Sequence, residues 1–192
     1  MADYPVQDSL VNEINSSISD YDVLMGEASK LWGQSSTDIE DLMRRVAFHE
    51  SKGDPKARQI LNDGSYGRGR GLYQFETGRG QGGHTAATRL KRYFGYTPED
   101  TLPEDLSWLN ITDEGFDASK LSPEQQNMLF LANYMGKKGE ESGMSGVNPE
   151  NLNEWWFREH NAGPDSTKES RMGSFNQDMK DFPKLKDYSG EY

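Results

Sequence analysis

A regular stripe of apolar residues leads to a glutamate near residue 50. The apolar residues recur at the i, i+3, i+4, i+7, i+8 spacing of an amphipathic helix, at Ile39, Leu42, Met43, Val46 and Ala47. Glu50 follows eleven positions after Ile39 and, at about 100° per residue, returns to within roughly 20° of the same stripe. The pattern therefore predicts a carboxyl group on the core side of the helix end. Apolar surroundings favour the neutral form of a carboxyl group, which a general acid needs at neutral pH. A glutamate that simply ends the helix at the surface is the alternative.

Other helices are predicted on both sides of this one. Residues 1–36 contain two amphipathic stretches and are expected to form an N-terminal helical arm, which either packs on the core or docks onto a partner. Thr37 and Glu40 form a capping box that begins the next helix. Further helices are expected over residues 85–94, 122–135, 152–156 and 166–182. Of the adjacent Trp155 and Trp156, one is expected in the core and the other in a groove. Residues 183–192 are expected to form a flexible tail.

The Gly-rich segment 64–83 cannot form a regular helix. Its run 71–75 is expected to be extended and to present Gln74 to a groove. The sequence therefore predicts a mainly α fold with one catalytic domain over residues 37–182, containing this extended Gly-rich segment.

Composition limits the class of protein. The 192 residues are 33% hydrophobic, which suits one domain with a modest core. No apolar stretch is long enough for a membrane helix, and the first residues lack the basic and apolar regions of a signal peptide. The chain has no cysteine, so neither disulfides nor a lipid-anchoring thiol are available.

Charge is unevenly distributed along the chain. The net charge of −11 argues against non-specific nucleic-acid binding by the whole chain, and no specific nucleic-acid partner is expected. Between Lys56 and Arg92, however, eight basic residues stand against two acidic residues, a local charge of +6. This segment is either a basic wall that meets an anionic ligand or a solvated loop whose arginines pair with the acidic remainder. A nucleic-acid site at Gly67–Gly71 is a weaker third interpretation, because no aromatic residues are interleaved in repeats.

Four short motifs occur in a fixed order along the chain: Glu50-Ser51, Asp54-Pro55-Lys56-Ala57, Gly71-Leu72-Tyr73-Gln74 and His160-Asn161-Ala162-Gly163-Pro164. Together they resemble the soluble lytic transglycosylase family of the lysozyme superfamily, over roughly residues 37–182. The resemblance implies a lysozyme-like fold. It also implies cleavage of peptidoglycan glycan strands between N-acetylmuramic acid and N-acetylglucosamine.

The resemblance assigns roles to particular residues. Glu50 protonates the glycosidic oxygen and then deprotonates the C6 hydroxyl of the same muramyl residue, which closes a 1,6-anhydro ring without water. Ser51, Gln74 and Asn161 look like the hydrogen-bonding frame for the sugar. For Gln74 and Asn161 the alternative is that they satisfy backbone groups at turns. No cofactor is implied, and the histidines lack the spacing of metal ligands.

Two departures from the family pattern leave the reaction open. His160 stands where the family has a tyrosine before Asn-Ala-Gly, and it is expected to take that place in the substrate-binding frame. Glu76 is an acid at a position that is usually neutral, and period-2 alternation would place it on the same face as Gln74. Glu50 and Glu76 together could activate water, as in a hydrolytic muramidase.

A cell-wall enzyme without an export signal needs another route to the wall. Delivery by a bacteriophage particle is one, so we expect a virion-associated protein that reaches the periplasm or cell wall of the host. Other virion proteins, of the tail or portal, are then candidate partners for the N-terminal arm. A structural virion protein that keeps a lysozyme-like fold with little or no activity is the alternative from another functional class.

Overall fold

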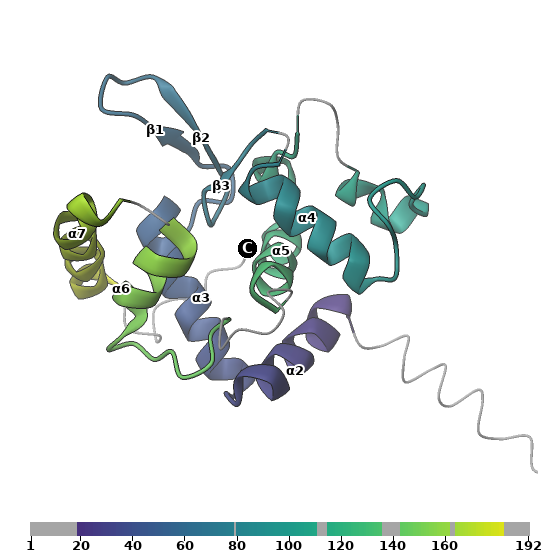
Figure 1. Cartoon of the computed structure of the whole chain (residues 1–192), viewed down its shortest axis with the longest axis horizontal. Coiled ribbons are helices and arrows are strands. Elements are labelled where there is room, and N and C mark those ends of the chain that lie inside the picture. Colours follow the sequence, from purple (N-terminus) through teal and green to yellow (C-terminus); the bar gives the residue numbers. More distant parts are fainter. Residues whose placement is uncertain (1–18, 79, 111–114, 136–142, 162–163, 183–192) are drawn as a thin grey trace, which may run out of the picture.

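A computed structural model describes residues 19–78, 80–110, 115–135, 143–161 and 164–182 of the chain. The fold is mainly helical with one small three-stranded sheet (Figure 1). In chain order the elements are α2 (Asp20–Trp32), α3 (Ser36–Ser51), β1 (Arg58–Ile60), β2 (Tyr66–Arg70), β3 (Phe75–Glu76), α4 (Gly82–Tyr93), the 3₁₀ turns η1 (Glu104–Leu109) and η2 (Ala118–Lys120), α5 (Pro123–Met135), α6 (Leu152–Trp155), the π-helical turn η3 (Trp156–Asn161), the 3₁₀ turn η4 (Asp165–Thr167) and α7 (Lys168–Asp181). Within the described ranges, none of the helices combines the length and the apolar character needed to cross a bilayer. The first half of the predicted arm, residues 1–18, and the tail 183–192 lie outside the described residues.

Helix α5 occupies the centre of the core. Its side chains are buried on nearly all sides, and α2 and α4 pack along it (Figure 1). A helix that is apolar all round is stable only when it is enclosed in this way. A capping box begins this helix, in which Gln125 N–H donates to Ser122 Oγ at 3.2 Å and Ser122 N–H donates to Gln125 Oε1 at 3.0 Å.

The predicted stripe on α3 is confirmed, since all five of its apolar residues are buried. The predicted cap is wrong by two residues. Ser35, not Thr37, begins the helix, and its Oγ accepts a hydrogen bond from Asp38 N–H at 3.1 Å. The stripe carries Glu50 to the last turn of α3, where Lys52 adopts a left-handed conformation with φ of 57° and ends the helix.

Helix α2 belongs to the same core as α3. Leu24, Met25, Ala28 and Trp32 are buried in the single cluster that also holds the α3 stripe. Of the two interpretations of the N-terminal arm, the structure therefore shows the packed one for residues 20–32.

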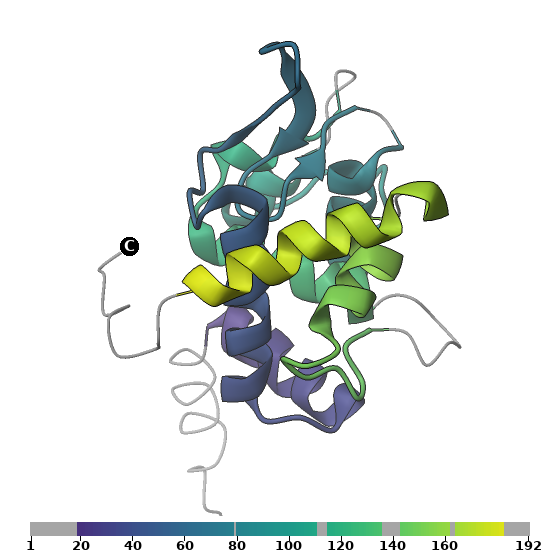
Figure 2. The same cartoon turned by 90° about the vertical axis from the view of Figure 1, so that its left-hand side faces the viewer.

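The sheet is antiparallel with strand order β1-β2-β3, and its β1–β2 hairpin projects from the helical body (Figures 1 and 2). The expectation of an extended run over residues 71–75 is wrong for residues 71–74 and holds only at Phe75, which begins β3. Residues 71–74 form a tight turn in which Gly71 has φ of 74° and Gln74 has φ of 49°.

The buried side chain of Gln126 on α5 explains this turn. Its Oε1 accepts a hydrogen bond from Leu72 N–H at 2.7 Å, and its Nε2 donates to Pro55 O at 3.0 Å and to Leu121 O at 3.1 Å. The backbone of Gly71 comes so close to this amide that a Cβ there would collide with Gln126 Oε1. A glycine with positive φ is therefore required where the turn meets α5.

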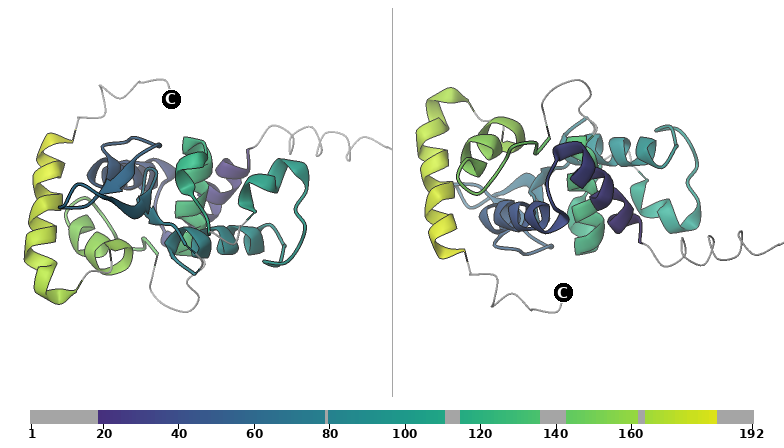
Figure 3. Two further views of the ribbon diagram at one scale, coloured as in Figure 1. Left: turned by 90° about the horizontal axis from the view of Figure 1, so that it is seen from above. Right: turned by 90° about the horizontal axis from the view of Figure 1, so that it is seen from below.

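Helix α7 crosses the outside of α3 and α6 (Figure 2). Seen from above and below, α7 lies at one end of the body and the α4–η1 region lies at the other (Figure 3). Phe175 is the buried anchor of α7, and it contacts the rings of Trp156 and His49.

Candidate active site

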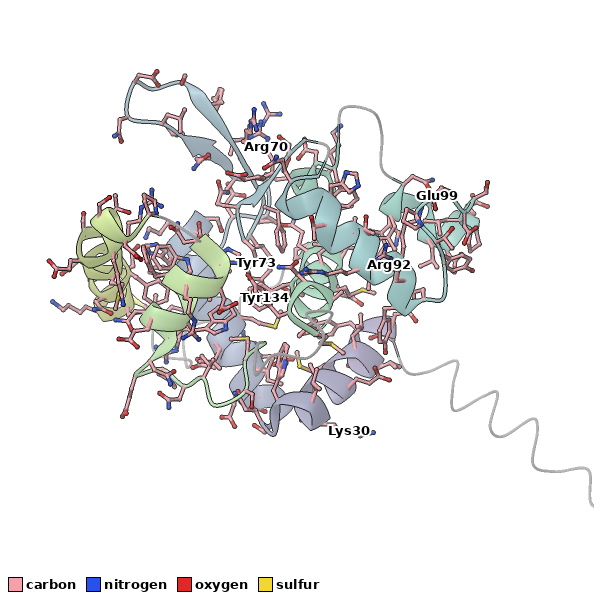
Figure 4. All side chains as sticks on the ribbon, in the orientation of Figure 1. Lys30, Arg70, Tyr73, Arg92, Glu99 and Tyr134 are labelled. Carbon is pink, nitrogen blue, oxygen red and sulfur yellow. The ribbon has the colours of Figure 1, made fainter. Side chains whose placement is uncertain are left out.

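A cleft of about 550 Å³ opens where the end of α3, the turn before β3, α5 and η3 meet. Five of the six residues predicted for the site line it: Glu50, Gln74, Glu76, His160 and Asn161. They come from positions up to 111 residues apart in the sequence, so the fold is what assembles them. Figure 4 labels two further lining residues, Tyr73 and Tyr134, at the centre of the molecule.

Ser51 is the predicted site residue that does not line this cleft. Its hydroxyl oxygen lies 2.9 Å from Ala47 O, on the preceding turn of α3, and also 2.9 Å from Leu72 O, so its hydrogen can be donated to either carbonyl. The second contact ties the end of α3 to the turn that carries Tyr73 and Gln74. The structure therefore gives Ser51 a part in joining the two walls of the cleft.

Glu50 is largely enclosed, with 14% of its side chain exposed. One of its oxygens, Oε1, accepts a hydrogen bond of 2.5 Å from the indole Nε1–H of Trp156. Trp155 and Trp156 are both buried, at 3% and 2% exposure, so the expectation that one of them lines the groove is wrong. Trp156 therefore does not line the cleft, but it contacts the Glu50 carboxyl group that does.

His160 occupies the position where a tyrosine was expected, and its ring is fixed from two sides. Its Nε2 lies 2.8 Å from Tyr73 O, and its Nδ1 lies 2.5 Å from Tyr134 Oη. A carbonyl oxygen can only accept, so Nε2 carries the hydrogen and, in the neutral ring, Nδ1 accepts from the Tyr134 hydroxyl. The same Nε2 is 3.6 Å from Glu50 Oε1, which is beyond hydrogen-bonding distance.

Tyr134 is fully buried on α5, and this sets its protonation state. Burial raises the pKa of its hydroxyl well above the ordinary value, and the nearby charges of Glu50 and Glu159 raise it further, while a hydrogen bond with Asn133 opposes them. The hydroxyl therefore stays protonated at neutral pH. A phenol that stays protonated keeps its hydrogen bond to Nδ1 of His160.

Gln74 and Glu76 reach the cleft by a route different from the predicted one. Gln74 lies in the turn and its Nε2 donates to Gly71 O at 2.8 Å, so its amide nitrogen also stabilises the turn. Glu76 is exposed on β3, opposite Gly69 of β2. Both residues line the cleft, although they do not follow regular strand alternation, because Gln74 belongs to the turn and has φ of 49°.

Asn161 lies at the end of η3 and is held by α7. Arg171 Nη1 donates to Asn161 Oδ1 at 2.6 Å, and both side chains line the cleft. A π-helical turn is rare and is often found at functional sites. Here it brings His160 and Asn161 to the wall of the cleft and places the indole of Trp156 behind Glu50.

Sequence reasoning missed Tyr134, Glu159 and Arg171 as lining residues, and it assigned Trp156 no contact with Glu50. Tyr134 follows the apolar pattern of α5, and this pattern predicts a core residue rather than a residue of the site. Trp156 and His160 are four residues apart, the spacing of one helical face, and this was the available signal for a joint role.

The basic segment separates into residues with different surroundings. Lys91 is buried and donates to Pro98 O at 2.9 Å, and Arg89 donates to Asn133 Oδ1 at 2.6 Å, so both are part of the fold. Arg70 is half-buried and donates to Gly67 O and Gly69 O of its own hairpin. Arg58 and Arg68 are exposed on β1 and β2 and, among the described residues of the sheet, remain available to a ligand.

Comparisons with protein-family models, with curated protein sequences and with solved structures give no significant match. The function must therefore be argued from the cleft and from the motifs that line it.

Proposed function

We propose that this chain cleaves the glycan strands of bacterial peptidoglycan, with Glu50 as the proton donor, in a lysozyme-like catalytic domain. The observation that carries the proposal is the enclosed carboxyl group of Glu50 at a cleft that also holds Gln74, His160 and Asn161. These residues belong to motifs that resemble the soluble lytic transglycosylases, and the fold brings three of the four motifs to one cleft.

The first step is protonation of the bridging oxygen between the two sugars. Glu50 transfers its proton to this oxygen as the bond to C1 of the muramyl residue breaks, and positive charge develops at C1. The resulting carboxylate faces that charge. The hydrogen bond from Trp156 to Oε1 stabilises the carboxylate at this stage.

The second step closes the ring. The Glu50 carboxylate takes the proton from the C6 hydroxyl, and the C6 oxygen forms a bond to C1, giving a 1,6-anhydro end. Glu50 is then protonated again, and no water is consumed. One carboxyl group is sufficient because the nucleophile is already tethered to the reacting sugar.

A second outcome is supported by the position of Glu76. It is exposed and lines the same cleft as Glu50, so it could take a proton from a water molecule that attacks C1. That pair of carboxyl groups would make the protein a hydrolytic muramidase with reducing ends as products.

Digestion of purified peptidoglycan, followed by mass spectrometry of the muropeptides, tests both outcomes. We expect 1,6-anhydromuramic ends, no product with Glu50→Gln, and substantial activity with Glu76→Gln. Glu99→Gln, an exposed residue away from the cleft, is the matched control and should digest normally.

Reducing ends, which are heavier by one water, together with loss of activity in Glu76→Gln, would replace the transglycosylase reaction by hydrolysis. Absence of any digestion by the unmodified protein would reject the enzymatic proposal. It would favour a structural protein with a lysozyme-like fold.

A further inference from the structure

We infer that Trp156 is a positioning residue that holds the Glu50 carboxyl group by one oxygen, so that the other oxygen carries the proton for transfer. This inference rests on the proposed function for its catalytic consequence, while the hydrogen bond itself can be tested independently. It concerns an indole that lies outside the motifs and does not line the cleft.

The direction of the hydrogen bond decides which oxygen is held. An indole Nε1–H can only donate, so Glu50 Oε1, 2.5 Å away, must accept. The carbonyl oxygen of a neutral carboxyl group is a better acceptor than its hydroxyl oxygen. The proton of neutral Glu50 is therefore favoured on Oε2. His160 Nε2 lies 3.6 Å from the same Oε1, which is beyond hydrogen-bonding distance, so it does not replace the indole as the donor to this oxygen.

Trp156 is itself held rigidly. The indole packs edge-on against His49, with ring centroids 4.5 Å apart, and against Phe175 of α7 at 5.2 Å. His49 Nδ1 is 2.7 Å from Asp178 Oδ2 on α7, which fixes the imidazole against the indole. The indole is thus packed between side chains of α3 and α7. Because it does not line the cleft, substrate can bind without moving it.

The consequence falls on the chemical step. The hydrogen bond to Oε1 is shortest and strongest when Glu50 is ionised, which is its state after the proton has been transferred. Removal of the donor should therefore lower kcat by roughly tenfold to a hundredfold, the effect of one lost hydrogen bond to a charged group. KM should change little, because the indole does not line the cleft.

Trp156→Phe is the test variant and Trp155→Phe is its matched control. Trp155 is equally buried, and its Nε1–H donates to a backbone carbonyl, Gly143 O, at 2.8 Å. Both variants lose a buried indole and one hydrogen bond. Only Trp156→Phe loses a donor to Glu50, so a loss of kcat in both variants alike would overturn the inference.

Nuclear magnetic resonance of the indole N–H groups gives a readout that needs no activity and no folded Trp156 variant. The chain has four tryptophans, so the indole signals of the ¹⁵N-labelled protein can be assigned individually. We expect the Trp156 signal to move with pH as Glu50 ionises, and this movement to vanish in Glu50→Gln. The Trp155 signal should move in neither protein.

The two proposals fail in different ways. An enzyme that digests peptidoglycan while the Trp156 signal ignores Glu50 would overturn this inference and leave the proposed function standing. A protein that digests nothing while the signal follows Glu50 would reject the proposed function and retain the hydrogen bond to Oε1.

Discussion

Replacing Gln126 by leucine should both destabilise the protein and disturb the cleft. Gln126 has no exposed surface and makes three hydrogen bonds to backbone groups, one each with Leu72, Pro55 and Leu121. Leucine has a similar volume but offers no partner to these groups. All three would be left unsatisfied at a position that water does not reach.

The magnitude follows from the number of groups left without a partner. Each buried polar group without a hydrogen bond costs about 1–3 kcal/mol. Partial relaxation reduces the sum, and single substitutions rarely exceed about 5 kcal/mol. We therefore expect Gln126→Leu to lower the free energy of unfolding by about 3–5 kcal/mol. This is a large share of the roughly 5–15 kcal/mol typical of a folded domain.

Urea unfolding followed by circular dichroism measures this loss, with Gln125→Leu as the matched control. Gln125 is one position earlier on α5 and makes a capping hydrogen bond near the surface, so its loss should cost about 1 kcal/mol. Below the unfolding transition, Gln126→Leu should also reduce the activity of the molecules that remain folded. The reason is that the turn at Leu72 carries Tyr73, whose carbonyl oxygen fixes His160. A decrease of less than about 1 kcal/mol in the free energy of unfolding of Gln126→Leu would refute the claim that Gln126 stabilises this turn.

Two further predictions concern charged residues. Burial tends to raise the pKa of Asp178, but hydrogen bonds from Lys52 and His49 outweigh it and hold this pKa below its ordinary value. The carboxylate should therefore stabilise the fold above about pH 4, its unfolded pKa, and lose this effect as the pH falls through the lower folded value. Asp178→Asn should thus be less stable than the parent protein at pH 6, and the gap in urea unfolding should narrow as the pH falls below about 4. A gap that does not change with pH would contradict this. Arg68→Gln should weaken binding to insoluble peptidoglycan a few-fold in low salt and reduce the dependence of binding on salt. A sedimentation assay measures both effects. Arg92→Gln, at an exposed arginine away from the cleft, is the control and should change neither the binding nor its dependence on salt.

The sequence predicted the elements best where burial follows a simple period. The stripe on α3 and the apolar run of α5 are buried as their spacing indicates, and both helices were placed within a few residues. Helical periodicity determines which face of a helix a residue occupies, and this was enough to direct Glu50 inward. It was not enough to predict the cap of α3, because Ser35 and Thr37 are both followed three residues later by an acid.

The path of the Gly-rich segment could not be predicted because its cause lies elsewhere in the chain. Nothing local to residues 71–74 indicates that a glutamine 54 residues after Leu72 will accept a hydrogen bond from its backbone. The run was therefore expected to be extended, whereas the structure has a turn with positive φ at Gly71 and Gln74. Gln74 and Glu76 line one cleft in spite of this error, since the turn reverses the chain beside α5.

The substitution at His160 shows why a motif that departs from a family pattern must be judged in three dimensions. The family pattern that the motifs resemble has a phenol at residue 160, next to the proposed proton donor Glu50, and this chain lacks it. In the structure a phenol is present within one hydrogen bond of this position: the Tyr134 hydroxyl on α5 contacts Nδ1 of His160, whose Nε2 lies 3.6 Å from Glu50 Oε1. Such an arrangement requires that the tyrosine be buried and protonated, which its raised pKa ensures. It also requires a carbonyl acceptor for Nε2, which Tyr73 supplies from the turn. The imidazole is thus positioned by Tyr134 of α5 and by the turn at Tyr73, and Gln126 joins this turn to α5. The contacts that accompany the departure at residue 160 therefore come from other segments of the chain, and no single motif could indicate them.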